Sequence, residues 1–102
     1  MIHKPKHPGR LIKSMLLEPL QLSASAAVKL LKISRLTLSK VINGHINITP
    51  AMAIRLAIVF STSEKLWINL QVNYDLWKAV KESKKLRLKP FKLPSSMAAI
   101  AA

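Results

Sequence analysis

Groups capable of catalysis or of metal binding are few and scattered in this sequence. Its 102 residues include no cysteine, three histidines and four acidic residues. The histidines and acidic residues show no spacing that would build a shared site: His3, His7, His45, Glu18, Glu64, Asp75 and Glu82. No phosphate-binding glycine loop is present either. We therefore expect a protein that is not an enzyme and that has no catalytic residues, no cofactor and no metal site.

Residues 34–43 carry the side chains best suited to chemistry with nucleic acid. Hydroxyl, amide and cationic groups bind phosphate oxygens and base edges, and an exposed apolar group packs on a thymine methyl. At about 100° per helical residue, Leu38, Val41 and Ile42 share one buried face, whereas Lys40 and Asn43 point away from it. The predicted DNA-binding residues are Ser34, Arg35, Leu36, Thr37, Ser39, Lys40 and Asn43. An ordinary solvated face has the same periodicity, so this pattern alone leaves both interpretations open.

Two short predicted helices, 23–31 and 34–43, position these side chains. About three residues join them, which is the layout of a helix-turn-helix whose second helix enters the DNA major groove. Ser23 and Ser34 are suitable N-caps, and Gly44 is suited to the left-handed conformation that ends a helix.

Three further helices are predicted around this pair. The first runs from about Pro8 to Glu18, with Leu11, Ile12, Met15 and Leu16 expected to face the core. The fourth begins at Thr49-Pro50 and reaches about Phe60, and the fifth, longer helix runs from Ser63 to about Lys85. The expected fold is therefore an all-α bundle of five helices with short connections.

The positive charge is concentrated at the two ends of the chain. Of the formal charge of +13, residues 1–13 carry four basic and no acidic residues, and residues 78–102 carry seven basic residues and one acidic residue. We expect a basic arm at 1–6, a domain at 7–85 and a flexible basic tail with prolines at 86–102. The charge favours nucleic acid first and an anionic membrane surface second, although lysine-rich ends also simply keep small proteins soluble.

No apolar run approaches the roughly 18 residues of a membrane-spanning helix, and the N-terminus lacks the apolar stretch of a signal peptide. We expect a cytoplasmic protein that does not act on a membrane.

Motifs along residues 7–80 occur in an order typical of one protein family. They are His7-Pro8-Gly9, Leu17-Glu18-Pro19-Leu20, Leu22-Ser23, Ala26-Ala27, Leu31, Ile33-Ser34-Arg35, Thr37-Leu38-Ser39-Lys40, Ile42-Asn43-Gly44, Ile48-Thr49-Pro50, Met52-Ala53-Ile54-Arg55-Leu56-Ala57, Trp67-Ile68-Asn69-Leu70-Gln71 and Asn73-Tyr74-Asp75-Leu76-Trp77. Together they resemble the HigA/VapI antitoxins of the Xre, or lambda-repressor-like, helix-turn-helix group. The first motif and the last two are more specific than the helix-turn-helix core.

The resemblance implies a fold, a function and two partners. The fold is a five-helix lambda-repressor-like DNA-binding domain with a longer C-terminal helix. The function is that of the antitoxin in a HigBA-type pair: a homodimer that represses its own operon at a palindromic operator and neutralises a HigB-like, mRNA-cleaving ribonuclease toxin. The alternative is a protein-interaction module, either a toxin neutraliser or an orphan regulator, that binds DNA only nonspecifically.

Two positions depart from the family pattern. Val28 stands where a small residue is expected between the second and third helices, and Lys32 stands where glycine is expected in the turn. A left-handed residue other than glycine costs about 1 kcal/mol. These departures affect the expected crossing angle of the two helices rather than the expected fold.

The fifth helix carries an aromatic stripe with two possible roles. Trp67, Leu70, Tyr74 and Trp77 share one face, to which Leu66, Leu76 and Val80 add. The stripe belongs either to the core or to a dimer interface, where Trp and Tyr often supply much of the binding energy. We expect it to serve both, with Trp67, Leu70, Tyr74 and Trp77 as the dimer residues. In such a dimer the recognition helices lie about 34 Å apart, which is one turn of DNA.

Overall fold

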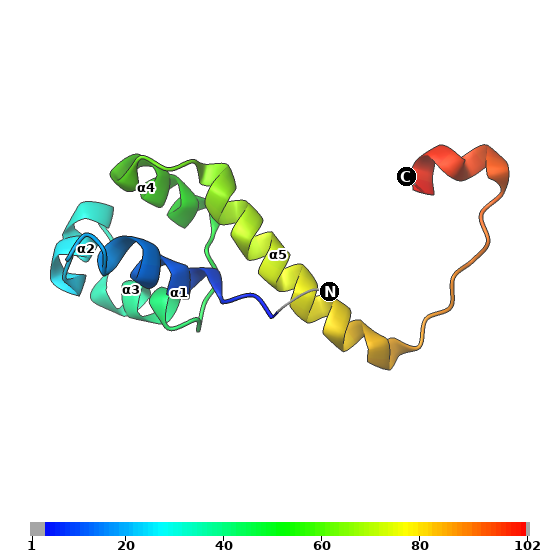
Figure 1. Ribbon diagram of the computed structural model, residues 1–102, viewed down its shortest axis with the longest axis horizontal. Helices are drawn as coiled ribbons and strands as arrows, with labels where there is room; N and C mark the ends of the chain where they lie inside the picture. The colour runs from blue at the N-terminus through cyan, green and yellow to red at the C-terminus, as the bar shows by residue number, and fades with distance from the viewer. Residues whose placement is uncertain (1–3, 102) are drawn as a thin grey trace.

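The computed structural model describes residues 4–101, and all regular structure within them is helical, as expected (Figure 1). In chain order the helices are α1 (Pro8–Ile12), a π-helical turn η1 (Lys13–Leu17), α2 (Ala24–Leu31), α3 (Arg35–Ile42), α4 (Pro50–Phe60) and α5 (Glu64–Ser83), followed by the 3₁₀ helices η2 (Lys84–Leu86) and η3 (Ser95–Ala101). The described part of the chain holds no helix with the length and hydropathy needed to cross a bilayer.

Four helices begin at hydroxyl N-caps, which confirms the predicted starts. In each case the hydroxyl oxygen accepts a hydrogen bond from the backbone N–H three residues later, at 3.0–3.2 Å; the caps are Ser23, Ser34, Thr49 and Ser63. A cap of this kind stabilises a helix by about 1 kcal/mol, because it satisfies an N–H that has no partner within the helix. Local sequence therefore determines where α2 to α5 begin.

The first helix ends differently from the prediction. Its second half is a π-helical turn, in which the N–H of Glu18 bonds to the carbonyl of Lys13 at 2.9 Å. The wider turn changes which side chains face inward. Leu17 is buried, whereas Met15 is 55% exposed. The expectation that Met15 faces the core is therefore wrong.

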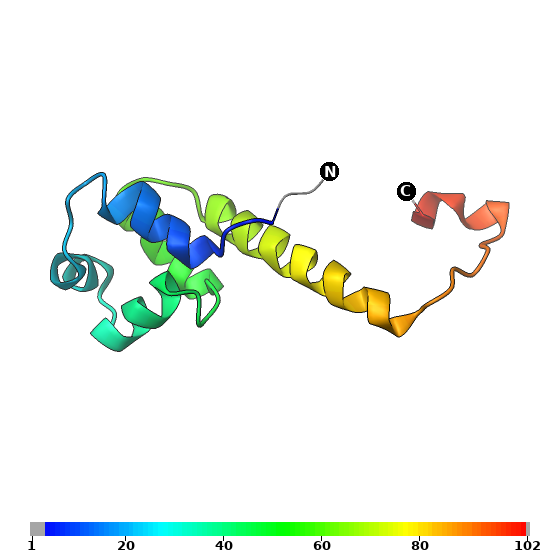
Figure 2. The same cartoon turned by 60° about the horizontal axis from the view of Figure 1, so that its bottom comes forward.

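The core lies where α1 to α4 gather around the first half of α5 (Figures 1 and 2). Its largest fully buried side chains are Trp67, Ile12, Leu31, Leu38 and Leu56. Helix α4 contributes a buried apolar face of Met52, Ala53, Leu56 and Ala57, with Phe60 half-buried at its end. The second half of α5 and the segment that follows it extend beyond this body, and the molecule measures 56 × 27 × 24 Å (Figure 1).

Gln71 joins the loop between α3 and α4 to α5. Its buried side-chain oxygen accepts a hydrogen bond from the N–H of Ile48 at 2.8 Å, and its amide donates to Asp75 at 2.9 Å. Nearby, the indole N–H of Trp67 donates to the hydroxyl of Thr62 at 2.8 Å. These bonds satisfy polar groups at the edge of the core, and the one from Ile48 to Gln71 ties α5 to the loop after α3.

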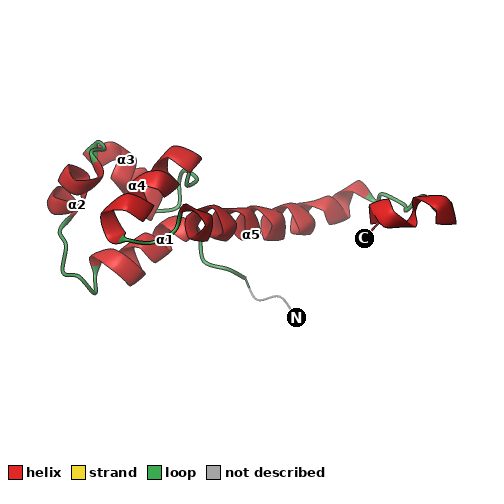
Figure 3. Ribbon diagram, turned by 90° about the horizontal axis from the view of Figure 1, so that it is seen from above, coloured by secondary structure: helices red, strands yellow, loops and turns green. Residues whose placement is uncertain are grey.

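The chain beyond α5 leaves the body of the molecule. Residues 87–94 have no regular structure and lead into η3 (Figure 3). Side chains from 78 to 100 are exposed throughout, including Leu88 and Phe91. The basic C-terminal segment therefore adds nothing to the core described above.

Candidate nucleic-acid interface

Helix α3 presents one buried and one exposed face, as its periodicity predicts. Leu38 and Val41 are each 2% exposed and pack in the core, and Ile42 is half-buried. On the other side Leu36 is 64% exposed, although it is a large apolar residue. Leaving such a side chain in water gives up the stabilisation of burial, so its place on this face is consistent with an apolar contact made on binding.

The predicted contact residues lie together on this exposed side. Thr37 is half-buried, and the others are exposed: Ser34, Arg35, Leu36, Ser39, Lys40 and Asn43. The Ser34 hydroxyl accepts from the N–H of Thr37 and donates to its hydroxyl at 2.8 Å. Further along, the side-chain amide of Asn43 donates to Ser39 at 3.3 Å. The hydroxyl and amide groups are therefore held in fixed positions on the helix.

Arg35 is directed toward α2 by a contact that helical periodicity does not predict. Its guanidinium donates to the hydroxyl of Ser25 at 3.2 Å, and both groups are exposed. A guanidinium has five N–H donors in a fixed planar arrangement. Arg35 can therefore bind a phosphate or a guanine while it keeps its hydrogen bond to Ser25. Ser25 therefore belongs to the candidate interface as a residue that orients Arg35.

The turn between α2 and α3 has the predicted left-handed conformation without glycine. Lys32 adopts φ 53° and ψ 49°. The guanidinium of Arg55, from α4, donates to the carbonyls of Leu31 at 2.7 Å and Lys32 at 3.3 Å. A cation at this position satisfies free carbonyls and interacts favourably with the negative end of the α2 dipole. Val28 is half-buried against the core, so the larger side chain is accommodated.

Two glycines allow α1 and the N-terminal arm to lie close to α3. A Cβ at Gly9 would overlap the backbone carbonyl oxygen of Val41, so α1 is packed directly against the α3 backbone. Gly44 follows α3 with φ +76°, and a Cβ there would lie 3.3 Å from the His7 ring. The arm, the start of α1 and the end of α3 therefore form one packed unit.

His7 is the polar centre of this unit. Its Nδ1 accepts a hydrogen bond from the N–H of Gly9 at 3.0 Å, and its ring meets Tyr74 of α5 edge-on at 4.9 Å. Burial lowers the pKa of His7 from 6.5, and the charges of Arg10 and Lys78 lower it further. The hydrogen bond to Asn47 and the charge of Asp75 act in the opposite direction and raise the pKa. The ring is thus held in the neutral form that the cap at Gly9 requires.

The aromatic stripe of α5 divides between core and surface. Trp67 is 1% exposed and packs in the core, which is one of the two roles expected of the stripe; its predicted place in a dimer interface stays a prediction. Leu70, Tyr74 and Trp77 are half-buried. Trp67 belongs to the core cluster, whereas Trp77 lines an open groove on α5.

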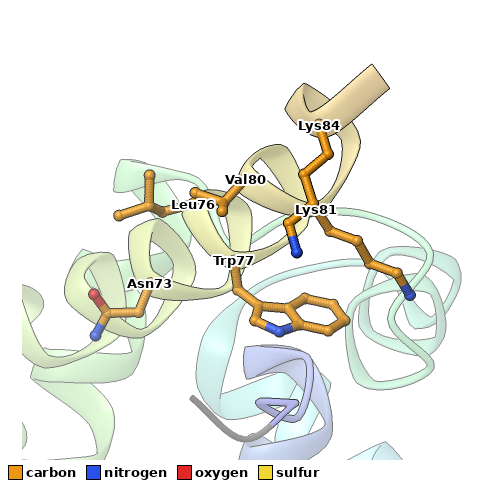
Figure 4. A pocket seen from close by; sticks show the side chains of 6 residues that line it. All are labelled: Asn73, Leu76, Trp77, Val80, Lys81 and Lys84. Carbon is orange, nitrogen blue, oxygen red and sulfur yellow. The ribbon is translucent and has the colours of Figure 1, made fainter. Parts of the chain in front are cut away.

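An open groove of about 590 Å³ runs along the second half of α5 (Figure 4). Leu76, Trp77 and Val80 supply its apolar lining, and Leu76 and Val80 are 60% and 50% exposed. Lys81 places its ammonium 5.6 Å from the centre of the Trp77 ring. Such exposed apolar side chains in a row are typical of a surface that binds a partner.

The polar residues that organise the site are harder to find from sequence than the contact residues. The sequence pattern puts His7 in a loop and gives Gln71 and Arg55 no role beyond the family motif. For Gln71 the one local signal in the sequence is its place one helical turn after Trp67, on the apolar side of the fifth helix. No three His, Asp or Glu side chains gather anywhere in residues 4–101 in a way that would hold a metal ion.

Comparison with known proteins gives consistent relatives, although no protein-family model matches the chain. An uncharacterised helix-turn-helix transcriptional regulator of Haemophilus influenzae is 40% identical over 77 residues, covering 76% of this chain and 72% of the relative. Antitoxin HigA-1 of Vibrio cholerae is 32% identical over 74 residues, covering 72% of this chain and 70% of the relative.

A solved structure supports the same assignment. The antitoxin HigA of Pseudomonas aeruginosa, determined with the higBA promoter, superposes with a TM-score of 0.80 at 32% identity, covering 86% of this chain and 99% of that one. The five-helix fold with a helix-turn-helix and a long C-terminal helix is thereby confirmed. Helix-turn-helix regulators and antitoxins of this kind are not enzymes. The chain belongs to the HigA/VapI family of the Xre-type helix-turn-helix DNA-binding proteins.

Proposed function

We propose that this chain is the antitoxin of a HigBA-type pair. It binds a palindromic operator in its own promoter as a homodimer, represses the operon, and neutralises a HigB-like mRNA-cleaving toxin. Residues 7–85 form the DNA-binding domain, with a basic arm at 1–6 and a flexible basic tail at 86–102; residues 1–3 and 102 lie outside the described residues. The DNA-contacting residues are those predicted on α3 from Ser34 to Asn43.

The observation that carries this proposal is the exposed face of α3. Leu36 is exposed between cationic and hydroxyl side chains, and Leu38 and Val41 anchor the opposite face in the core. A helix held in this way can enter a major groove with its donors and one apolar group already in place. The HigA relative with a structure determined together with its promoter shares this fold.

Fluorescence anisotropy tests the DNA-binding part directly. Labelled DNA from directly upstream of the gene and a scrambled duplex of the same composition are titrated at about 50 and 200 mM salt. We expect a preference for the upstream DNA of about a thousandfold, with affinity falling steeply as salt rises. Equal, salt-labile binding to both duplexes would leave only a basic surface and would reject the repressor role.

Substitutions on α3 test which helix reads the DNA. Lys40→Ala and Arg35→Ala each remove a contact worth about 1–3 kcal/mol, so operator affinity is expected to fall by about 5- to 150-fold. Lys65→Ala, which removes one exposed charge from the first turn of α5, is the matched control. If neither α3 variant weakens operator binding more than the control does, α3 is not the recognition helix.

We infer that the groove on α5 forms the dimer interface, with Leu76 and Val80 joining Leu70, Tyr74 and Trp77. An apolar row of this kind is buried when two copies pair about a two-fold axis. Leu76→Asp is expected to shift the mass in solution, measured by light scattering, from dimer to monomer and to weaken operator binding. Leu88→Asp, at a 79% exposed position beyond α5, is the control. A wild-type chain that is monomeric at micromolar concentration would overturn the inference.

Neutralisation of the toxin has its own test. A HigB-like ribonuclease, purified from a small gene beside this one where such a gene is found, is mixed with the chain at increasing ratios, and cleavage of a reporter mRNA is followed on gels. We expect cleavage to stop at a fixed stoichiometric ratio. Full cleavage at a tenfold excess of the chain would restrict the function to DNA binding.

The high net charge favours a second candidate function. A formal charge of +13, carried mostly by the chain ends, attracts any nucleic acid without regard to sequence. In this alternative the chain is a protein-interaction module, and its DNA binding is incidental. A tight complex with the toxin together with equal affinity for upstream and scrambled DNA is the result that would favour it.

A further inference from the structure

The N-terminal arm closes a basic pocket beside the end of α3. This pocket, of about 400 Å³, is lined by Lys4, Lys6 and Arg10 together with Asn43, Gly44 and Tyr74. No carboxylate is among its lining residues, although the arm also lies near α5, which carries Asp75. Three cations around one opening, with no counter-charge in its walls, favour an anionic occupant.

The walls of this pocket are fixed by packing rather than by the lysines themselves. His7 holds the arm through its hydrogen bond to Gly9 and its contact with Tyr74. The same ring lies against Gly44, which ends the turn after α3. His7, which directly follows the arm, is therefore held by buried contacts, and the exposed side chains of Lys4, Lys6 and Arg10 line the pocket around it.

The pocket is continuous with the proposed reading face of α3. Asn43 lines it and also lines a second basic hollow of about 330 Å³, which contains Lys6, Arg10 and Lys13, with Glu18 as its one acidic lining residue. Asn43 in turn is bonded to Ser39 on the exposed face of α3. A DNA strand that follows this face beyond the end of α3 therefore meets the arm next.

We propose that the arm pocket binds a phosphate of the DNA backbone next to the bases that α3 contacts. This inference rests on the proposed function and adds a contact outside the helix-turn-helix. Cationic side chains bind phosphate through charge-assisted hydrogen bonds, and such contacts set the register of a protein on DNA without reading sequence. Because the pocket is packed against the end of α3, the phosphate held there fixes how deeply α3 lies in the groove.

Lys6→Gln together with Arg10→Gln tests the pocket, since both side chains are exposed and their replacement leaves the core intact. The control, Lys65→Gln with Lys89→Gln, removes two exposed charges elsewhere. Anisotropy is measured on upstream and scrambled duplexes over a range of salt concentrations, after circular dichroism has confirmed equal helix content. We expect the slope of log affinity against log salt to become shallower by about 0.9 for each phosphate that the protein no longer binds, in the pocket variant only. The ratio of affinities for the two duplexes is expected to change little.

Two results would overturn the proposal. If the pocket variant and the control change the slope equally, the arm contributes only to the general field of the protein. The second result combines two measurements on the pocket variant. If inorganic phosphate shifts the amide resonance of Gly44 in the wild type but not in the variant, the pocket binds phosphate. If the variant nevertheless keeps the wild-type slope of log affinity for DNA against log salt, the pocket serves a free anion instead. The proposed function fails separately, when the wild type itself shows no preference for upstream DNA.

Discussion

Replacing Gly9 by alanine tests whether close packing of α1 against α3 organises this protein. The added Cβ would overlap the carbonyl oxygen of Val41, which already accepts a hydrogen bond from Gly44 at 3.0 Å. The obstacle is backbone rather than a flexible side chain, so α1 and α3 must move apart. Overpacking of this kind costs about 1–3 kcal/mol. Alanine favours a helix over glycine by at most about 1 kcal/mol, which offsets part of this cost. With a clash of about 3 kcal/mol, the upper end of the range above, the net loss of stability is about 2 kcal/mol.

Thermal unfolding followed by circular dichroism measures this loss. At about 4–8 °C per kcal/mol for a domain of this size, Gly9→Ala is expected to lower Tm by about 8–16 °C. Gly44→Ala places its Cβ 3.3 Å from the ring of His7 at φ +76°, so its expected cost is smaller, about 1 kcal/mol. Ser14→Ala, at an exposed position on the same segment, serves as the control. A Gly9→Ala protein with wild-type or higher Tm would refute the packing argument.

Three further predictions concern polar groups. Gln71→Leu leaves the buried N–H of Ile48 without the acceptor that lies 2.8 Å away in the wild type. The free energy of unfolding, measured by urea titration, is expected to fall by about 1–3 kcal/mol. An unchanged value would show that the bond is dispensable. Ser34→Ala removes the cap at the N–H of Thr37 and is expected to cost about 1 kcal/mol in the same assay; a cost equal to that of Ser14→Ala would deny the cap its role. Because burial lowers the pKa of His7 from 6.5, the unfolded chain binds the proton more readily, so this contribution to stability is complete above about pH 6.5 and is lost as the pH falls below it. His7→Asn keeps an acceptor for the cap and is expected to flatten the change in Tm between about pH 7.5 and 5; an identical pH profile would exclude His7 as the cause.

Helix boundaries were predictable because local chemistry determines them. Each capping hydroxyl binds an N–H group of its own helix, as at Ser23, Ser34 and Thr49. Such caps can therefore be predicted from the neighbouring sequence alone. The π-helical turn was not predictable, because the choice of Leu17 over Met15 as the buried residue depends on what the segment packs against. Periodicity assumes a constant helix type, so a wider turn shifts the side chains that follow it away from the expected pattern.

In the candidate site, too, the features set by one helix were predictable and those set by packing between segments were not. The exposed face of α3 followed from helical periodicity, since a single helix determines which of its residues share a side. Contacts between distant segments did not follow: Arg35 meets Ser25 from another helix, and His7 meets Tyr74 from the far end of the domain. The basic arm could be recognised by its composition, but only tertiary packing places it beside the end of α3.

The hydrogen bonds of Arg55 give α4 an influence over the DNA-binding motif that its own position would not suggest. The guanidinium holds the last carbonyls of α2 and the left-handed turn at Lys32, and therefore the angle at which α3 leaves that turn. On the same helix Ile54 and Ile58 are 50% and 75% exposed, and Ile54 is next to Arg55 in the chain. The two hydrogen bonds therefore link the position of α4 to the turn between α2 and α3. The helix-turn-helix of this protein is therefore braced from outside by α4, and its turn is not held by α2 and α3 alone.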